Sequence, residues 1–196
     1  MKKVGLLILM IILVHRGFGQ DIKPEVSTPM FIRWSWSHNH VLSSPWNFPA
    51  QPGMGVNAAL GLRINGLGVK WPLEAALEYS NFGFHNTAEP AQVFPEIQHH
   101  IDLLGLSLVA KPTIFSKGMG RMYGIVGFNP SVILGRELRV EGLENPYGSP
   151  KMVCPVRFGG GYEKDRWAVD LYYDVSDRRI GGIYYGALRV GFSLYF

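Results

Sequence analysis

Residues 188–196 read LRVGFSLYF, and apolar side chains occupy every second position of this stretch. Successive residues of a β-strand point to opposite faces. One face would carry Leu188, Val190, Phe192, Leu194 and Phe196, and the other Arg189, Gly191, Ser193 and Tyr195. Because a tilted strand of about 9–11 residues can cross a bilayer, this alternation predicts a membrane-spanning strand with one face for lipid.

Comparable alternation marks eight segments that we expect to be strands. They span residues 30–38, 53–65, 69–83, 99–112, 121–134, 152–163, 167–176 and 184–196. Tight turns at 65–68 and 164–166 and a shorter connection at 113–120 alternate with longer connections. Short turns on one side and long loops on the other are typical of outer-membrane barrels. The sequence therefore predicts an all-β fold, an eight-stranded antiparallel transmembrane β-barrel in the cell outer membrane.

Charged residues support this prediction, because a basic side chain on the lipid face at mid-bilayer costs about 2–4 kcal/mol. With the apolar faces outside, only Asp102 among the strand charges points outward. Those expected inside are Arg33, Arg63, Lys70, Glu74, Glu78, Lys111, Arg121, Arg157, Glu163, Asp170, Asp174 and Arg189. Eight strands enclose a space that side chains just fill, so we expect a plugged lumen. Its charge network is expected to comprise Arg33, Arg63, Glu74, Glu78, Arg157, Asp170, Asp174 and Arg189.

A soluble periplasmic barrel that binds a ligand is the alternative fold, because it also alternates, with the apolar side chains inside. Its exterior would carry about 25–35% charged residues, whereas the polar faces here are mostly Gly, Ala and Ser. Aromatic residues near the strand ends, such as Trp34, Trp71 and Trp167, also favour the interface girdles of a membrane protein.

Prolines interrupt two of the expected strands, and a closed barrel has no free edge to accept them. Pro130 and Pro155 lie in the fifth and sixth segments, toward the long-loop side. We expect a bulge or frayed pairing between these two strands near the outer rim.

The first residues form a separate unit. Lys2 and Lys3 precede an apolar run over 4–14, and small residues follow at 17 and 19, which predicts a signal peptide at 1–19 and a barrel domain at 20–196. Its removal takes three of the 19 basic residues, which leaves 16 against 15 acidic ones and a net charge of +1. Most of the net positive charge of the full chain lies in the signal peptide. The net charge of the barrel domain therefore predicts no nucleic-acid partner.

The terminal pattern of Arg189, Gly191, Leu194 and Phe196 resembles the C-terminal signal of outer-membrane barrels. That resemblance implies recognition by the barrel-assembly machinery.

The whole barrel domain resembles the PorT-like family of small outer-membrane barrels. The resemblance rests on HHIDLLGLSLVAKP (99–112), RMYGIVGFNPSVILG (121–135), VRFGGGYE (156–163), WAVDLYYDVSD (167–177) and the terminal strand. It implies eight strands, and one branch of the family is tied to a protein-secretion apparatus.

Candidate sites for chemistry are sparse. Five histidines remain at the long-loop rim, namely His38, His40, His85, His99 and His100. Their spacing matches no metal motif, so we expect no metal and no cofactor. The favoured function is a non-enzymatic structural, binding or secretion- and assembly-associated barrel, embedded among outer-membrane lipids. The alternative is a lipid-modifying enzyme using His99, His100, Ser43 and Ser44. Apolar side chains of the outer loops, such as Trp46, Phe48 and Phe94, suit either of two roles: they dock a protein or glycan, or they fold over each other and cap the barrel.

Overall fold

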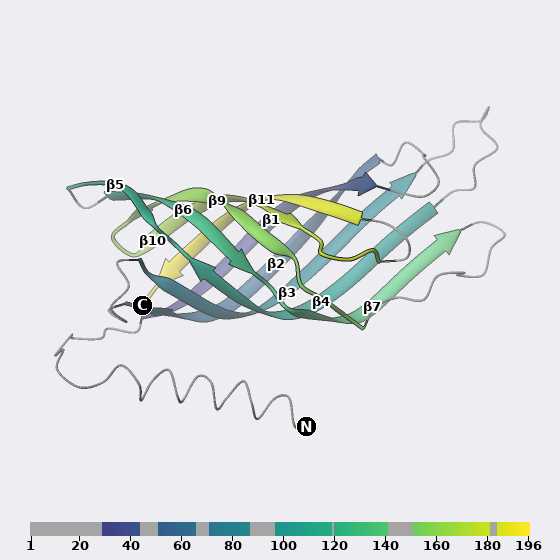
Figure 1. Ribbon diagram of the computed structural model, residues 1–196, viewed down its shortest axis with the longest axis horizontal. Helices are drawn as coiled ribbons and strands as arrows, with labels where there is room; N and C mark the ends of the chain where they lie inside the picture. Colours follow the sequence, from purple (N-terminus) through teal and green to yellow (C-terminus); the bar gives the residue numbers. More distant parts are fainter. Residues whose placement is uncertain are drawn as a thin grey trace, which may run out of the picture.

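The computed structural model describes residues 29–43, 51–65, 71–86, 97–118, 120–140, 151–180 and 184–196. This part of the chain forms β1 (Met30–Ser43), β2 (Gln51–Ile64), β3 (Leu73–Asn86), β4 (Ile97–Ala110), β5 (Thr113–Lys117), β6 (Gly120–Phe128), β7 (Ser131–Val140), β8 (Met152–Val153), β9 (Val156–Lys164), β10 (Trp167–Val175) and β11 (Tyr184–Tyr195) (Figure 1). In these described ranges no helix is both long and apolar enough to cross a membrane.

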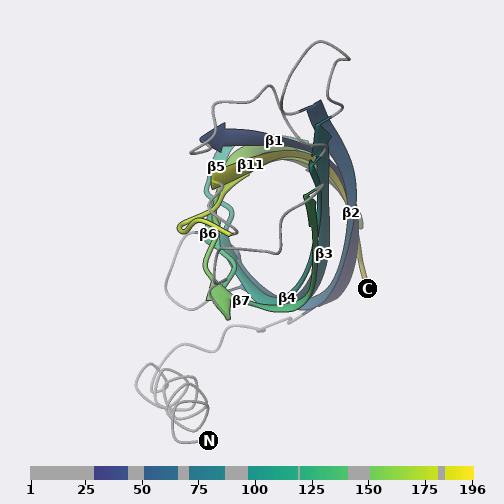
Figure 2. The same ribbon diagram turned by 90° about the vertical axis from the view of Figure 1, so that its right-hand side faces the viewer.

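The strands form one antiparallel sheet that closes on itself. The sheet runs β5-β6-β9-β10-β11-β1-β2-β3-β4-β7-β8, and a further pairing of β4 with β6 completes the ring (Figure 2). That pairing joins residues 108–110 to residues 126–128. β4 with β5, β6 with β7 and β8 with β9 each occupy one position in the wall, so the barrel has eight strand positions. The predicted eight-stranded antiparallel barrel is confirmed.

The wall is interrupted where the sequence places Pro130 and Pro155. The first proline separates β6 from β7, and the second separates β8 from β9. Each proline still accepts a backbone hydrogen bond, from Leu106 N–H at 3.0 Å and from Asn129 N–H at 2.9 Å. Beyond this point β7 and β8 share two residue pairs. The pairing between these strands is frayed, as predicted, but the described residues on either side of the prolines contain no bulge, because Phe128 pairs with Val156 and Ser131 with Val153 in the same register. A proline has no N–H to donate to the ladder.

The prediction for residues 113–120 is wrong in part, because five of them form the strand β5 and pair with β6. β4 ends two residues before the predicted boundary, since Pro112 cannot donate to its ladder. The Pro112 carbonyl accepts a hydrogen bond from Gly124 N–H at 2.8 Å, and the chain then resumes as β5. The turn between β5 and β6 places Gly118 at φ +62°, a conformation that suits glycine.

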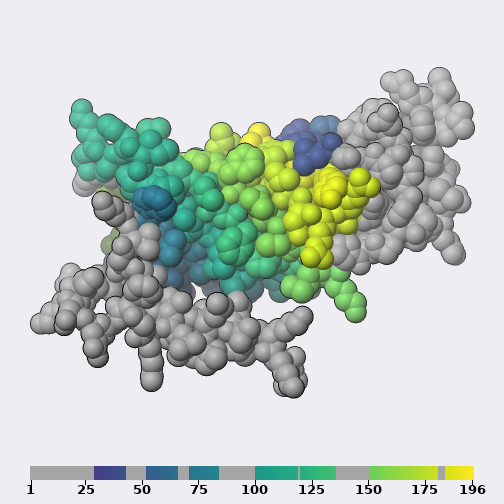
Figure 3. All heavy atoms as spheres, in the orientation of Figure 1, coloured from purple at the N-terminus to yellow at the C-terminus, as the bar shows by residue number. Residues whose placement is uncertain are grey.

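Apolar side chains cover the outside of the barrel and charged side chains fill its inside. Leu60 and Leu171 expose 52% and 54% of their surface, whereas Asp170 exposes none. Figure 3 shows one side of this wall, on which neighbouring side chains touch along the barrel. The soluble alternative would require the opposite orientation and is therefore wrong.

Candidate functional site

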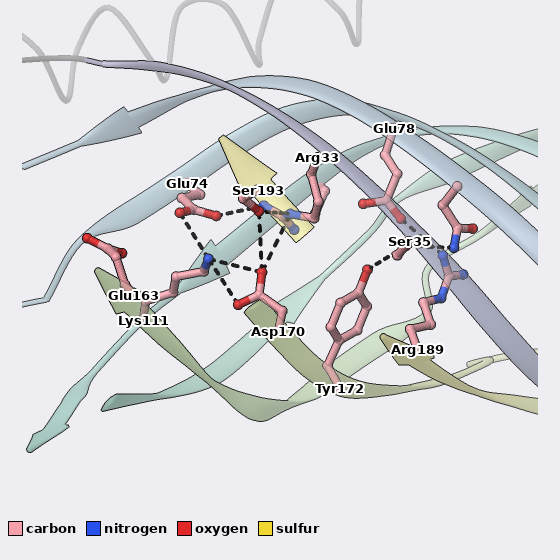
Figure 4. A network of polar contacts seen from close by, with 12 residues as sticks. Arg33, Ser35, Glu74, Glu78, Lys111, Glu163, Asp170, Tyr172, Arg189 and Ser193 are labelled. Atoms are coloured by element: carbon pink, nitrogen blue, oxygen red, sulfur yellow. Dashed lines mark hydrogen bonds and ion pairs between the residues drawn. The ribbon is translucent and has the colours of Figure 1, made fainter. Parts of the chain in front are cut away.

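The inner wall carries two groups of ion pairs, one toward the turns and one toward the loops (Figure 4). In the turn-side cluster, Glu74 of β3 is the central acid. Its Oε2 lies 2.6 Å from Arg33 Nη2, and its Oε1 lies 3.1 Å from Lys111 Nζ and 3.2 Å from Arg63 Nη2. These cations come from β1, β2 and the end of β4, so one carboxylate ties together four parts of the wall.

Asp170 of β10 is the second acid of the turn-side cluster. Its carboxylate lies 3.3 Å from Lys111 Nζ and accepts a hydrogen bond from the Tyr123 hydroxyl at 2.5 Å. Tyr195 connects both acids, because its hydroxyl donates to Glu74 at 2.8 Å and accepts from Lys111 at 3.2 Å. Buried ions are stable when such extra hydrogen bonds complete their coordination.

The loop-side cluster is built around Glu78 and Asp174. The Arg157 guanidinium lies between them, 2.7 Å from Glu78 and 2.8 Å from Asp174. Arg189 binds the same two acids, with distances of 3.5 Å and 2.9 Å. All four side chains are almost fully buried. They come from β3, β9, β10 and β11, so this cluster spans the lumen.

A layer of uncharged polar residues separates the two clusters. The Tyr172 hydroxyl lies 3.2 Å from Ser35 Oγ, which in turn accepts a hydrogen bond from Asn57 Nδ2 at 2.9 Å. The Arg157 guanidinium lies 4.3 Å from the centre of the Tyr172 ring, a distance typical of a cation–π contact.

The eight network residues predicted from the sequence all line the interior, four in each cluster. Arg33, Arg63, Glu74 and Asp170 belong to the turn-side cluster, and Glu78, Arg157, Asp174 and Arg189 to the loop-side cluster. The predicted network omitted Lys111, which bridges the two acids of its cluster, and the phenols of Tyr123 and Tyr195. The sequence already predicted that Tyr195 lies on the polar face. It did not predict that its hydroxyl connects Glu74 and Lys111. Lys70 lies outside the described residues.

Gly161 of β9 makes room for this interior, because an acidic and an aromatic side chain lie where its Cβ atom would be. A Cβ on Gly161 would lie 2.6 Å from Asp170 Oδ1 and 2.7 Å from Tyr123 Cζ. The glycine at position 161 therefore relieves crowding inside the barrel.

We expect Gly161→Ala to lower the free energy of unfolding by about 1–3 kcal/mol, because overpacking strains a filled interior. Gly191→Ala is the matched control, since a Cβ there meets nothing nearer than 3.4 Å. Urea titration of refolded protein, followed by tryptophan fluorescence, measures both. Equal stability of the two variants would contradict the account of a tightly filled lumen.

Above the ion pairs, the loop-side end of the interior is apolar. The cluster comprises Phe82, Ile101, Leu103, Val153, Ile180, Tyr185 and Ala187. Ile180 comes from the segment after β10 and is fully buried. This apolar layer explains why Leu103 falls on the nominally polar face of its strand.

The outward charge Asp102 is held by polar neighbours near the loop-side rim. Its Oδ1 accepts hydrogen bonds from the Tyr79 hydroxyl at 2.6 Å and from Asn81 Nδ2 at 2.9 Å. His100 Nε2 lies 3.5 Å from the same oxygen. His40 forms a hydrogen bond with Tyr173 on the outer surface. The side chains of Ser43, Ser44, His85 and His99, and the predicted outer-loop docking residues Trp46, Phe48 and Phe94, lie outside the described set.

The residues of the expected assembly signal divide between the two faces of β11. Arg189 and Gly191 face the interior, whereas Leu194 and Phe196 face outward. Phe196 also closes the barrel seam, because its N–H and carbonyl pair with Met30 at 3.0 Å and 3.1 Å.

An antiparallel barrel that is closed, apolar outside and ion-paired inside belongs to the transmembrane β-barrels of the outer-membrane type. The outer membrane is accordingly where this chain resides. A comparison with protein-family models found no match, and a comparison with curated proteins found none.

Solved structures include similar barrels. Neisserial surface protein A is 16% identical over 85% of this chain and 97% of that chain, with a TM-score of 0.52. Ail of Yersinia pestis is 13% identical over 88% and 100% of the two chains, with a TM-score of 0.41. OprG from Pseudomonas aeruginosa is 12% identical over 90% and 99%, with a TM-score of 0.45. At such identity, the likeness to Neisserial surface protein A shows the fold alone.

Proposed function

We propose that the chain is a non-enzymatic outer-membrane barrel whose interior is plugged by ion pairs and which acts through its exposed ends. One observation carries this proposal. The acids Glu74, Glu78, Asp170 and Asp174 are each held by buried cations. Carboxylates neutralised in this way are poor general acids or bases, because catalysis needs a proton that can be exchanged with substrate.

Conductance in planar bilayers tests the plugged interior. We expect no large steady current from the purified protein, because the two clusters and the Tyr172 layer occupy the lumen. A 16- or 18-stranded porin, which encloses an aqueous channel, is the positive control. Large stable openings under the same voltage would overturn the proposal.

The lipid-modifying enzyme is supported by no described contact. His100 points outward and lies 2.9 Å from Asn81 Nδ2. Altered lipid composition after His100→Ala in otherwise intact cells would favour the enzyme over the proposal.

A PorT-like role in protein secretion is the finer form of the proposal, and the sequence resemblance is its support. The same holds for recognition of the last strand by the barrel-assembly machinery and for contact with outer-membrane lipids. A protein or glycan at the outer loops stays a prediction. For the signal peptide at 1–19, the length and composition of the first residues are the support.

We expect Phe196→Ser to lower the assembled fraction in cells severalfold while leaving the stability of refolded protein within about 1 kcal/mol, a small effect typical of surface sites. The side chain is exposed and its backbone hydrogen bonds to Met30 survive the change. Heat-modifiable gel mobility of membrane fractions measures assembly. Met152→Ser, another exposed apolar site outside the last strand, is the control; an equal loss there would argue against a terminal signal.

A further inference from the structure

The hairpin of β5 and β6 extends the barrel wall at the turn side, where it projects beyond the neighbouring strands (Figures 1 and 3). β5 spans Thr113–Lys117, and all five residues are exposed. Within the described ranges its ladder is with β6 alone. One edge of β5 therefore offers backbone groups to a further strand.

The outer face of this hairpin is apolar, and a β-bulge makes it so. The register shifts between Thr113 and Phe115, which places Phe115 opposite Met122, a residue of the lipid-facing side. Ile114 lies beside Gly124, which shares that side. Ile114 exposes 74% of its surface and Phe115 exposes 56%. Without the bulge, two consecutive residues would point to opposite faces.

The inner face of the hairpin is polar and already paired. Arg121 Nη1 donates a hydrogen bond to Thr113 Oγ1 at 3.3 Å. Its Nη2 also lies 2.9 Å from Glu163 Oε2. Among the described residues, the outer edge of β5 and its apolar outer face are thus left without an assigned contact.

Whether this hairpin lies in the hydrocarbon or in the water beside it, an added strand along the edge of β5 would stabilise it. In hydrocarbon, the apolar face would be satisfied, but an open strand edge is not tolerated there. In water, the edge would be hydrated, but Ile114 and Phe115 would stay exposed at considerable cost. An added strand pairs the edge and continues the wall, which satisfies both requirements.

Exposed charge around the hairpin indicates the character of that strand. Lys117 ends β5, and Lys164 lies opposite Gly120 at the start of β6. Arg166 follows in the next turn beside the acidic Asp165, and these four charged residues are exposed, whereas Glu163 is paired with Arg63 and Arg121. A net positive rim favours an acidic partner.

From the bulge, the free edge and the basic rim, we infer that β5 is a docking edge for an extended, acidic segment of another polypeptide on the periplasmic, turn side of the membrane. The inference rests on the proposed function, since it names a partner for a barrel that acts through its ends. β-strand addition of this kind draws affinity from backbone hydrogen bonds.

Peptide binding to the purified barrel in phosphatidylcholine nanodiscs tests this edge. The probe is a fluorescent seven-residue peptide of alternating valine and glutamate, and its lysine counterpart is the control. We expect saturable binding of the acidic peptide and at least tenfold weaker binding of the basic one. Lys117 and Gly120 form the last residue pair of the hairpin. Because neighbouring N–H groups of a strand point to opposite edges, the N–H of Ser116 points away from β6, toward the free edge.

Ser116→Pro is therefore expected to weaken the acidic peptide at least tenfold, whereas Ser116→Ala leaves binding unchanged. Lys117→Glu, which keeps the backbone intact and brings the net charge of this rim to zero, is expected to remove the preference between the peptides. Heat-modifiable gel mobility reports whether each variant is folded.

Three outcomes would overturn the inference. One is absence of saturable binding by the acidic peptide, or equal binding to Ser116→Pro. Another is protection of the free-edge Ser116 amide from hydrogen exchange in nanodiscs containing anionic phosphatidylglycerol without peptide, which would assign the edge to lipid. The third is a dimer in detergent that Ser116→Pro dissociates, which would assign it to a second copy. None of these depends on bilayer conductance, so the docking edge and the plugged lumen can fail separately.

Discussion

Glu78→Leu will lower the free energy of unfolding by about 3–5 kcal/mol, because removing one partner of a buried ion pair leaves an uncompensated charge. The carboxylate is the shared acceptor of Arg157 and Arg189, at 2.7 Å and 3.5 Å. In the variant, Asp174 alone would face both guanidinium groups. Urea titration of the protein refolded into vesicles measures the change.

Two further variants make this result specific to charge. Glu163→Gln removes an acid whose side chain is 15% exposed at the turn-side rim. It leaves Arg63 paired with Glu74 at 3.2 Å, so we expect a smaller loss than for Glu78→Leu. Glu78→Leu combined with Arg157→Met should recover part of the stability, because a matched apolar pair replaces a buried ion pair with little penalty. A double variant no more stable than Glu78→Leu would argue that shape, and not charge, matters at this position.

Leu171→Arg will destabilise the barrel by about 2–4 kcal/mol, the price of a basic side chain at the lipid-facing midplane. Leu171 lies at the centre of β10 and is 54% exposed. Leu171→Met keeps an apolar side chain of similar volume, so we expect a change below about 1.5 kcal/mol.

Position within the bilayer provides the second comparison. Met30→Arg places the same charge at the turn-side end of β1, where we expect a cost of about 0–1 kcal/mol. Both arginine variants are titrated in phosphatidylcholine vesicles. Equal destabilisation at Leu171 and Met30 would mean that hydrocarbon does not surround the middle of this wall.

Alternation in the sequence was sufficient to predict the closed barrel and the direction of the charged side chains. Each inward residue is determined locally, because a strand has a fixed two-residue period. The disruption at Pro130 and Pro155 was also local, since each proline removes an N–H. The added strand β5 was not predictable in this way. The adjacent Ile114 and Phe115 break the alternation, and they share a face only through the bulge.

The partners within the lumen could not be read from the sequence. Glu78 and Arg157 are 79 residues apart, and their meeting depends on the register of the whole ring. Lys111 shows the same limit: its inward direction was predicted, but its position between Glu74 of β3 and Asp170 of β10 depends on how these strands face each other across the ring. The apolar layer around Phe82 and Ile101 also lies on inward positions, where a simple two-face scheme expects polar residues.

The loop-side cluster has a consequence for how the ring is completed. Glu78 lies on β3, while its cations lie on β9 and β11, which reach it only when the sheet has curled round. Until then, the unpaired ions of a half-curled sheet need water. Closure of the barrel and dehydration of its lumen are consequently a single event. Any assembly factor that inserts this sheet must therefore leave its concave face hydrated until the barrel closes.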